Sequence, residues 1–342
     1  MKTGNENPSR DEWKSLYDAT EAFKSIRPWG WMEDADLFGV QNPEDGEIGY
    51  CCVLGAAGEV FGLSVYLGAE GLTTYRDIVS GEIGMGNEDI LFTQKALTAF
   101  LEDREEIEKE DLKIIKDLGL KFRGRNAWPQ FRSHLPGYVP WHLNSEQVRF
   151  LTLALEQAVE VADRLRENPE LLEDEGEDRI FVRVPEKGEG RLFWKDAWIT
   201  PQAWEKPMVT VPPVDEVRLR RIASHSKKGL GAWELDTFHF PNPVAEGERP
   251  YFPCLSIVVD RGAGLILGSW LKSPWERYSD LYEEVLGLME KGKTLPRTIR
   301  VCRKEIFDLL KPITSALKIG LNQVESLEGV EGFRQALVNE MF

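Results

Sequence analysis

The hydrophobic pattern of residues 36–67 predicts three consecutive β-strands. The short apolar runs LFGVQ, IGYCCVL and EVFGLSVYL are separated by the turn sequences NPEDG and AAG. Residues 11–26, before these strands, carry apolar side chains at helical spacing, and Pro28 ends that run. The first part of the chain is therefore expected to be a helix followed by a β-meander.

Helical and extended patterns alternate through the next hundred residues. We expect a helix from Gly71 to about Ser80, the strand ALTAFL, and a helix beginning near Lys109. Asn144 and Ser145 then cap a long amphipathic helix. One apolar stripe follows that helix: Val148, Leu151, Leu155, Ala158, Val159, Ala162 and Leu165.

The acidic segment ENPELLEDEGED, residues 167–178, has few apolar residues and is predicted to be a linker between two domains. The domains would then span residues 1–166 and 179–342. Strands are expected around Ile180–Val184 and Trp194–Ile199, followed by a Pro-rich connector. After it come an apolar hairpin at 252–271, a helix at 274–291, a strand at 298–302, a further helix, and a last strand from Leu321.

Parts of this order occur twice. At an offset of 206 residues, Val53, Ala57, Gly58, Gly62 and Val79 fall on identical residues, and the elements that follow keep the same order. The agreement favours two related αβ units fused in tandem. The predicted fold class is α+β (mixed α/β), with two domains whose mixed sheets are flanked by helices. A crossover helix implies parallel pairing, so we expect a strand parallel and adjacent to residues 254–260.

Composition indicates an ordinary soluble protein. Of its residues, 42% are hydrophobic and 29% are charged, and no run approaches the roughly 18–20 apolar residues that span a membrane. The first residues, MKTGNENPSRDEWK, lack the apolar core of a signal peptide, so a cytoplasmic location is predicted. Adjacent Cys51 and Cys52 would point to opposite faces of a strand and cannot readily share a tetrahedral metal site. All four cysteines are interpreted as reduced packing residues, and no motif indicates a metal or cofactor.

The net charge of −16 makes nucleic acid an unlikely partner class, because phosphate backbones need a basic surface. The most basic segment is VRLRRIASHSKKG, in which Arg218 and Arg220 alternate with Val217 and Leu219. That alternation predicts the solvent face of a strand. A protein partner is compatible with the sequence, which does not identify one.

Residues 122–143, FRGRNAWPQFRSHLPGYVPWHL, combine aromatic side chains with prolines in a pattern too irregular for one element. Arginine and large aromatic residues dominate binding surfaces, so the binding candidates are Trp128, Arg132, Tyr138, Trp141 and His142. His134 and His142 could also form a proton-transfer pair. The alternative is a structural strap packed across the first domain with Trp141 largely buried. We favour the strap.

Asp260 ends the apolar strand CLSIVV, before a second strand and then helix, strand, helix and strand. This layout resembles the ribonuclease H-like core of integrases and transposases, over roughly 80 residues. The resemblance implies an Asp on the first strand, a second on a later short strand, and a carboxylate on a later helix, which together hold two Mg²⁺ ions. Here Cys302, Arg303 and Lys304 stand where the second carboxylate would be needed. Asp260 is therefore a remnant candidate, with a turn residue as the alternative.

Most of the chain also resembles a group of bacterial two-domain proteins of unknown function. The runs that carry the resemblance are residues 29–32, 38–43, 49–53 and 59–68, with PRTIRVCRKEIFDLLKPITSALKIGL near the end. It implies a bacterial, intracellular protein and transfers no catalytic residue. Because no complete catalytic set is found, the sequence favours a non-catalytic binding or scaffold protein. The alternatives are a degenerate metal-dependent nucleic-acid-processing enzyme of ribonuclease H-like fold, and another enzyme that uses the aromatic segment.

Overall fold

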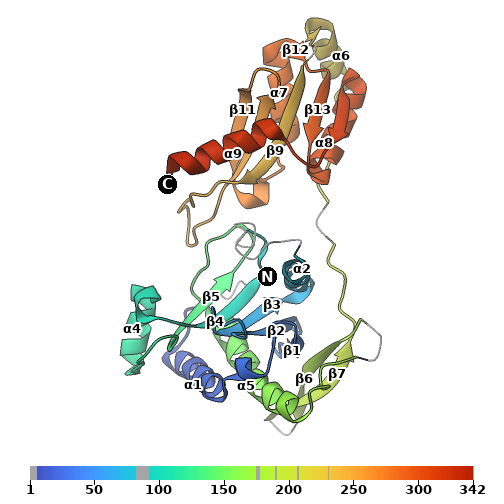
Figure 1. Ribbon diagram of the computed structural model, residues 1–342. Coiled ribbons are helices and arrows are strands. Elements are labelled where there is room, and N and C mark those ends of the chain that lie inside the picture. The colour runs from blue at the N-terminus through green and yellow to red at the C-terminus, as the bar shows by residue number, and fades with distance from the viewer. Residues whose placement is uncertain are drawn as a thin grey trace. The chain divides into compact units, whose positions relative to one another are not determined.

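The computed structural model describes residues 6–81, 92–174, 178–188, 191–205, 208–229 and 231–341. The chain divides into two compact units, residues 1–204 and 205–342. Each is an α+β arrangement of helices on a mixed sheet (Figure 1). No described helix is both long enough and apolar enough to span a membrane.

The first unit is built on a seven-stranded sheet with the order β5-β4-β3-β2-β1-β6-β7. The strands β1 (Phe38–Gln41), β2 (Ile48–Leu54), β3 (Gly62–Leu67), β4 (Ala96–Glu102) and β5 (Trp128–His134) form an antiparallel meander. The three strands predicted at residues 36–67 are confirmed. The segment expected to be irregular contains the regular strand β5. Pro129 does not interrupt this strand, because β5 lies at the edge of the sheet, where proline is tolerated.

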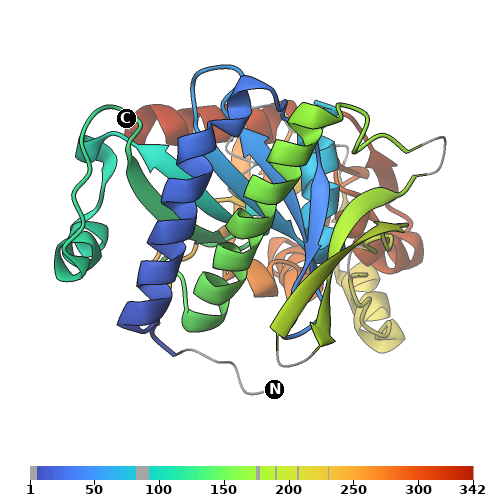
Figure 2. The same cartoon turned by 90° about the horizontal axis from the view of Figure 1, so that it is seen from below.

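Two long helices pack side by side on one face of this sheet, α1 (Arg10–Ile26) and α5 (Ser145–Glu167) (Figure 2). Each begins with a reciprocal capping box, formed by Ser9 with Glu12 and by Asn144 with Gln147. α2 (Gly68–Val79) covers the other face through a smaller apolar cluster. Cys51 lies in the core under α1 and α5, and Cys52 lies in the α2 cluster, as the strand alternation predicted.

The chain returns to this sheet after α5. β6 (Ile180–Gly188) pairs in parallel with β1, and β7 (Arg191–Ile199) forms the outer edge. Buried Arg183 of β6 donates a hydrogen bond to Gln157 of α5 at 2.9 Å. The division therefore falls after Trp204, not in the acidic segment 167–178. That segment is an acidic connection within the first unit, because β6 is needed to cover the edge of β1.

The second unit contains a five-stranded sheet with the order β11-β10-β9-β13-β14. β9 (Ala232–His239), β10 (Cys254–Asp260) and β11 (Leu265–Lys272) are antiparallel, whereas β13 (Thr298–Val301) and β14 (Gly320–Gln323) run parallel to β9. Short β8 (Lys227–Lys228) and β12 (Thr294–Leu295) pair separately.

Helices cover both faces of the second sheet. α7 (Leu281–Gly292) and α8 (Lys304–Leu317) pack on one face, and α9 (Glu328–Met341) packs on the other (Figure 1). α6 (Glu216–His225) contains the basic segment, so the strand predicted there was wrong. The alternation over residues 217–220 is too short to distinguish a strand from a helix. Leu219 and Ile222 lie three residues apart, the spacing that places two buried side chains on one face of a helix.

The internal similarity does not extend to strand topology. In the repeated order of elements β4 would correspond to β13, yet β4 lies antiparallel to β3, whereas β13 lies parallel to β9. The two sheets are therefore not tandem copies of one strand arrangement. The strand expected to be parallel and adjacent to β10 was also misplaced, since both neighbours of β10 are antiparallel to it and the parallel pairing begins at β9.

Candidate functional site

A pocket of about 630 Å³ lies between the start of α1, the helix α4 (Lys109–Leu118) and residues 142–143. Its apolar surface comes from Trp13 of α1, Ile114 and Leu118 of α4, and Leu143. α4 ends at Gly119, which adopts the left-handed conformation (φ 73°) common after helices. Because α4 follows β4 and α1 precedes β1, the pocket joins segments more than 90 residues apart in the sequence.

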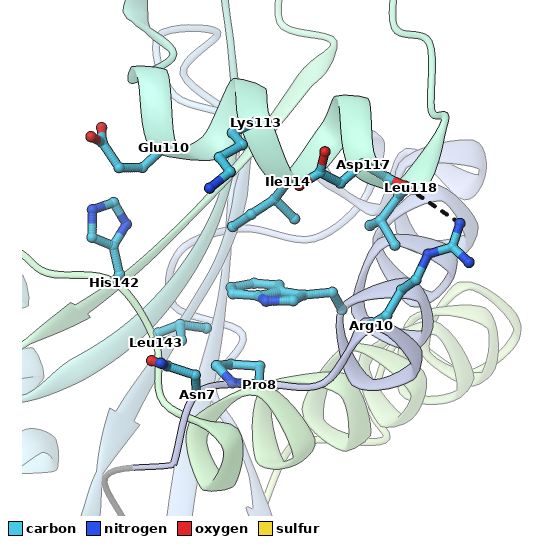
Figure 3. Close-up of a pocket in the computed structure, with 11 residues that line it drawn as sticks. Asn7, Pro8, Arg10, Glu110, Lys113, Ile114, Asp117, Leu118, His142 and Leu143 are labelled. Carbon is cyan, nitrogen blue, oxygen red and sulfur yellow. Dashed lines mark hydrogen bonds between the residues drawn. The ribbon is translucent and has the colours of Figure 1, made fainter.

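Charged groups stand at both ends of this pocket. At one end Arg10 donates a hydrogen bond to the carbonyl of Asp117 at 3.4 Å, which ties α1 to α4. At the other end Glu110 and Lys113 of α4 stand across from His142 (Figure 3). The pocket therefore has an apolar middle between polar ends.

Arg132, a predicted binding residue, is instead a buried structural cation. It lies on β5 and donates two hydrogen bonds to buried Asp111 of α4, at 3.1 and 2.7 Å. It also lies 3.0 Å from Glu108, the residue before α4. Burial lowers the pKa of Arg132, but the hydrogen bonds to Asp111 and Glu108 outweigh burial, so the pKa is raised. Arg132 fixes α4 against the sheet and thereby shapes the pocket.

His142 is half-buried at the pocket rim. Its Nε2 lies 3.9 Å from a carboxylate oxygen of Glu108, the same carboxylate that contacts Arg132. The structure therefore brings two predicted residues, Arg132 and His142, to one carboxylate. His134 contacts Thr98 instead, with 3.2 Å between Nε2 and Oγ1, so each histidine has its own neighbours.

Glu108, Glu110 and His142 place one ligand atom each within 4.8 Å of one another. Nitrogen and carboxylate donors of this kind suit Zn²⁺. However, two of the three residues are exposed, and Arg132 already occupies Glu108. The group could hold a divalent cation only in competition with that guanidinium, and metal chemistry is not assigned to it.

The other predicted residues of the aromatic segment are separate from this group. Trp128 opens β5 and packs its ring 5.8 Å from that of Phe122. Tyr138 lies in the turn after β5, where its N–H bonds the carbonyl of Leu135. Trp141 pairs through its backbone with Ser133 at 2.8 and 2.9 Å. Its side chain is half-buried, so the strap with a largely buried Trp141 stays a prediction.

Asp260, the remnant candidate, lies in the second unit. Its carboxylate accepts hydrogen bonds from the N–H groups of Gly262 and Ala263, both at 2.9 Å. This is the local turn that an aspartate at a strand end commonly forms. Asp260 also lies on the second strand of the unit's sheet, since β9 precedes β10.

Two carboxylates on that earlier strand, β9, were not predicted from the sequence. Glu234 is fully buried and accepts from Arg300 at 2.9 Å and from the N–H of Gly329 in α9 at 2.7 Å. Arg261 lies 3.4 Å from the same carboxylate. Asp236 accepts from Arg303 at 3.0 Å. The sequence AWELDTFH, in which apolar residues alternate with these two carboxylates, could have indicated a strand that carries carboxylates on one face.

Two protein-family models match parts of the chain. The model described as "Domain of unknown function (DUF7309)" matches residues 13–183, half of the chain. The chain belongs to this family. The DUF7309 region runs from α1 into β6, so it contains the pocket residues from Trp13 onwards and extends past residues 167–178. A second model, "Domain of unknown function (DUF6930)", matches residues 218–338 of the second unit. No curated protein matches the sequence.

Proposed function

We propose that this chain is a non-catalytic binding protein that holds a protein partner at the pocket between α1, α4 and residues 142–143. The observation that carries the proposal is the lining of that pocket. An apolar surface from Trp13, Ile114 and Leu118 is enclosed by charges of both signs. Such a site suits an apolar side chain flanked by polar groups, which is the usual anatomy of a protein-binding pocket.

The described pocket residues also include no serine, threonine, cysteine or tyrosine. His142 therefore has a carboxylate neighbour but no hydroxyl or thiol to activate, which favours binding over nucleophilic catalysis. The cysteine–histidine contact of the second unit, with 3.6 Å between Cys254 Sγ and His239 Nδ1, offers no better centre. Cys254 is fully buried, and burial raises the pKa of its thiol.

An enzyme of ribonuclease H-like fold is the second candidate, favoured by the second unit's strand order. From β9 onwards the elements run as an antiparallel three-strand meander, helix, strand, helix, strand and helix. This order supports the resemblance to integrases and transposases, with β9 rather than β10 as the first strand. The carboxylates that could hold a metal would then be Glu234 and Asp236.

Those carboxylates argue for a degenerate site. Arg300 and Arg261 face Glu234, and Arg303 bonds Asp236. A divalent cation would have to displace or sit beside these guanidiniums, which electrostatic repulsion opposes. Nucleic-acid processing is therefore the weaker reading of the second unit. Bacterial origin and a cytoplasmic location stay predictions.

Capture of partners from extracts of the source cells tests the binding proposal. Ile114→Glu places a charge on the pocket wall, and Val217→Glu is the matched control at an exposed apolar residue of α6. We expect Ile114→Glu to lose a partner that the wild type and Val217→Glu retain, at a temperature where circular dichroism shows all three proteins folded. If all three proteins capture the same partners, the pocket is not the binding site.

Calorimetric titration with Mn²⁺ tests the second candidate. Heat of binding that disappears in Asp236→Asn would favour a metal-dependent centre in the second unit. We expect no such binding, because the arginines already neutralise the carboxylates.

A further inference from the structure

We infer that the first unit has a second binding site, for a nucleotide-like ligand in which a phosphate is joined to a flat aromatic ring. The site consists of two adjoining pockets that share Arg123 and Arg125, in the loop between α4 and β5. Their volumes are about 510 and 720 Å³, within the range of about 300–1,000 Å³ typical of small-ligand sites. We call them together the arginine cleft.

The arginine cleft is positively charged in an acidic protein. Five cations line it, against three carboxylates, whereas the whole chain carries −16. The cations are Lys24, Arg27, Arg104, Arg123 and Arg125, and the carboxylates are Glu21, Asp103 and Glu105. A local surplus of positive charge on such a protein attracts anions selectively to this place.

Two of these arginines have no acidic partner in the part of the chain that the structure describes. Arg27 and Arg123 are exposed, and no carboxylate of a described residue lies within ion-pair distance of either. Arg125 makes only a long contact, 4.0 Å, with Asp103, and its side chain is 92% exposed. Acidic residues exceed basic ones by 16 in this chain, and Arg27 and Arg123 line the same pocket with no described carboxylate paired to either, so both are available to an oxyanion. Guanidinium groups bind phosphate through paired, charge-assisted hydrogen bonds.

The backbone fixes this arrangement. Arg27 ends α1 in the left-handed conformation (φ 53°), and Asn126 adopts the same conformation (φ 47°). Both residues line the first pocket. Glycine would take the position after α1 at lower conformational cost than this arginine. Asp103 holds the loop by accepting a hydrogen bond from the N–H of Asn126 at 2.8 Å.

Aromatic rings stand beside the cations in both pockets. Trp29 and Phe61 line the first, with ring centroids 5.3 Å apart, and Trp128 lines the second, with Arg104 over its ring at 5.6 Å. Trp29, Phe61 and Trp128 are all half-buried. A flat ring can stack on the exposed part of such a side chain while its phosphate reaches the arginines. This combination selects a nucleotide over a simple anion.

Titration calorimetry of the full chain at low salt tests the inference, with ADP, pyrophosphate and adenosine as separate probes. We expect ADP to bind more tightly than either of the other two. Arg123→Ala should weaken ADP and pyrophosphate by about tenfold, the loss of one charge-assisted hydrogen bond, and leave adenosine unchanged. Trp29→Leu should weaken ADP and adenosine and leave pyrophosphate unchanged. Phe61→Leu replaces Trp29→Leu if the latter lowers the melting temperature.

Arg220→Ala is the matched control, because Arg220 is an exposed arginine of α6 paired with Glu216. Three results with these probes and variants would overturn the inference. They are the absence of ADP binding at millimolar concentration, equal weakening by Arg220→Ala and Arg123→Ala, and pyrophosphate binding as tight as ADP. An oligothymidylate of eight nucleotides that binds tenfold more tightly than ADP would also overturn it, in favour of a single-stranded nucleic-acid surface.

Discussion

Arginine has opposite surroundings in two regions of this molecule. On the α9 face of the second sheet, Arg261, Arg300 and Arg303 meet carboxylates on β9, one of which, Glu234, is fully buried. In the arginine cleft of the first unit, Arg27 and Arg123 are exposed and meet no described carboxylate. The first arrangement satisfies buried charge and stabilises the fold, whereas the second leaves charge available for a ligand. The surroundings of an arginine, more than its presence, indicate its role.

The largest effect is expected where the charge is most deeply buried. Arg300→Met removes the closest guanidinium from Glu234 and should destabilise the protein by about 3 kcal/mol, because only Arg261, at 3.4 Å, remains to balance this fully buried carboxylate. The double variant Glu234→Gln with Arg300→Met should recover most of that loss, since the amide still accepts from the N–H of Gly329. Urea unfolding measures both. Equal losses in the single and double variants would show that the unpaired charge of Glu234 is not the cause of the lower free energy of unfolding.

A smaller loss is expected for the buried pair of the first unit. Asp111→Asn removes one of the two hydrogen bonds that Arg132 donates, because an amide nitrogen cannot accept, and it weakens the other. The change should cost about 1.5–3 kcal/mol, since Glu108 remains beside the guanidinium. Glu108→Gln, at an exposed carboxylate, is the control and should cost less. Denaturant unfolding followed by circular dichroism compares the two. A larger loss for Glu108→Gln would mean that the exposed carboxylate is the main partner.

Truncation of tryptophans tests whether the arginine cleft is also part of the core. Trp128 packs against the main core and against Phe122, so Trp128→Ala should cost about 1–2 kcal/mol. Trp141 is half-buried and outside that cluster, so Trp141→Ala should cost less. Thermal melts of the two variants make the comparison. A larger loss for Trp141→Ala than for Trp128→Ala would favour the strap anchored by Trp141, as the sequence predicted.

The smallest effect is expected at Glu12, a half-buried and paired carboxylate near the start of α1. Hydrogen bonds from Ser145, Ser9 and Arg149 lower the pKa of Glu12 from 4.5 to about 2. Because the folded-state pKa is lower than the unfolded one, this stabilisation is complete above pH 4.5 and is lost as the pH falls towards 2. Glu12→Gln should therefore flatten the decline in stability between pH 5 and pH 3. Glu59→Gln, at an exposed turn residue, should leave that decline unchanged in urea unfolding at both pH values.

Local elements of the fold could be predicted, and long-range ones could not. α1, α5 and the strands β1 to β3 follow directly from apolar spacing and capping residues such as Asn144. Strand order depends on pairings between distant segments, such as β1 with β6, and leaves no local trace in the sequence. This is why the acidic segment 167–178 was mistaken for a linker. The same composition is typical of a short exposed connection.

The sites were harder to predict for the same reason. The aromatic segment drew attention to Trp128 and His142, which line two different pockets. Their companions come from elsewhere, since Arg27 ends α1 and Phe61 precedes β3. Likewise Glu234 could be recognised as a buried charge only after β9 was placed at the centre of its sheet. Single residues were identifiable, but the sets to which they belong were not.

The return of β6 to the first sheet has a practical consequence for any shortened form of this protein. A fragment that stops after α5 would lack the strand that hydrogen-bonds β1 at Gly39 and Val40. It would present an unpaired apolar edge to solvent, a template on which other copies can add strands. Such a fragment is expected to aggregate, whether it arises from cloning or from cleavage in the acidic connection. Expression of the first unit alone should therefore extend through β7, to about Trp204.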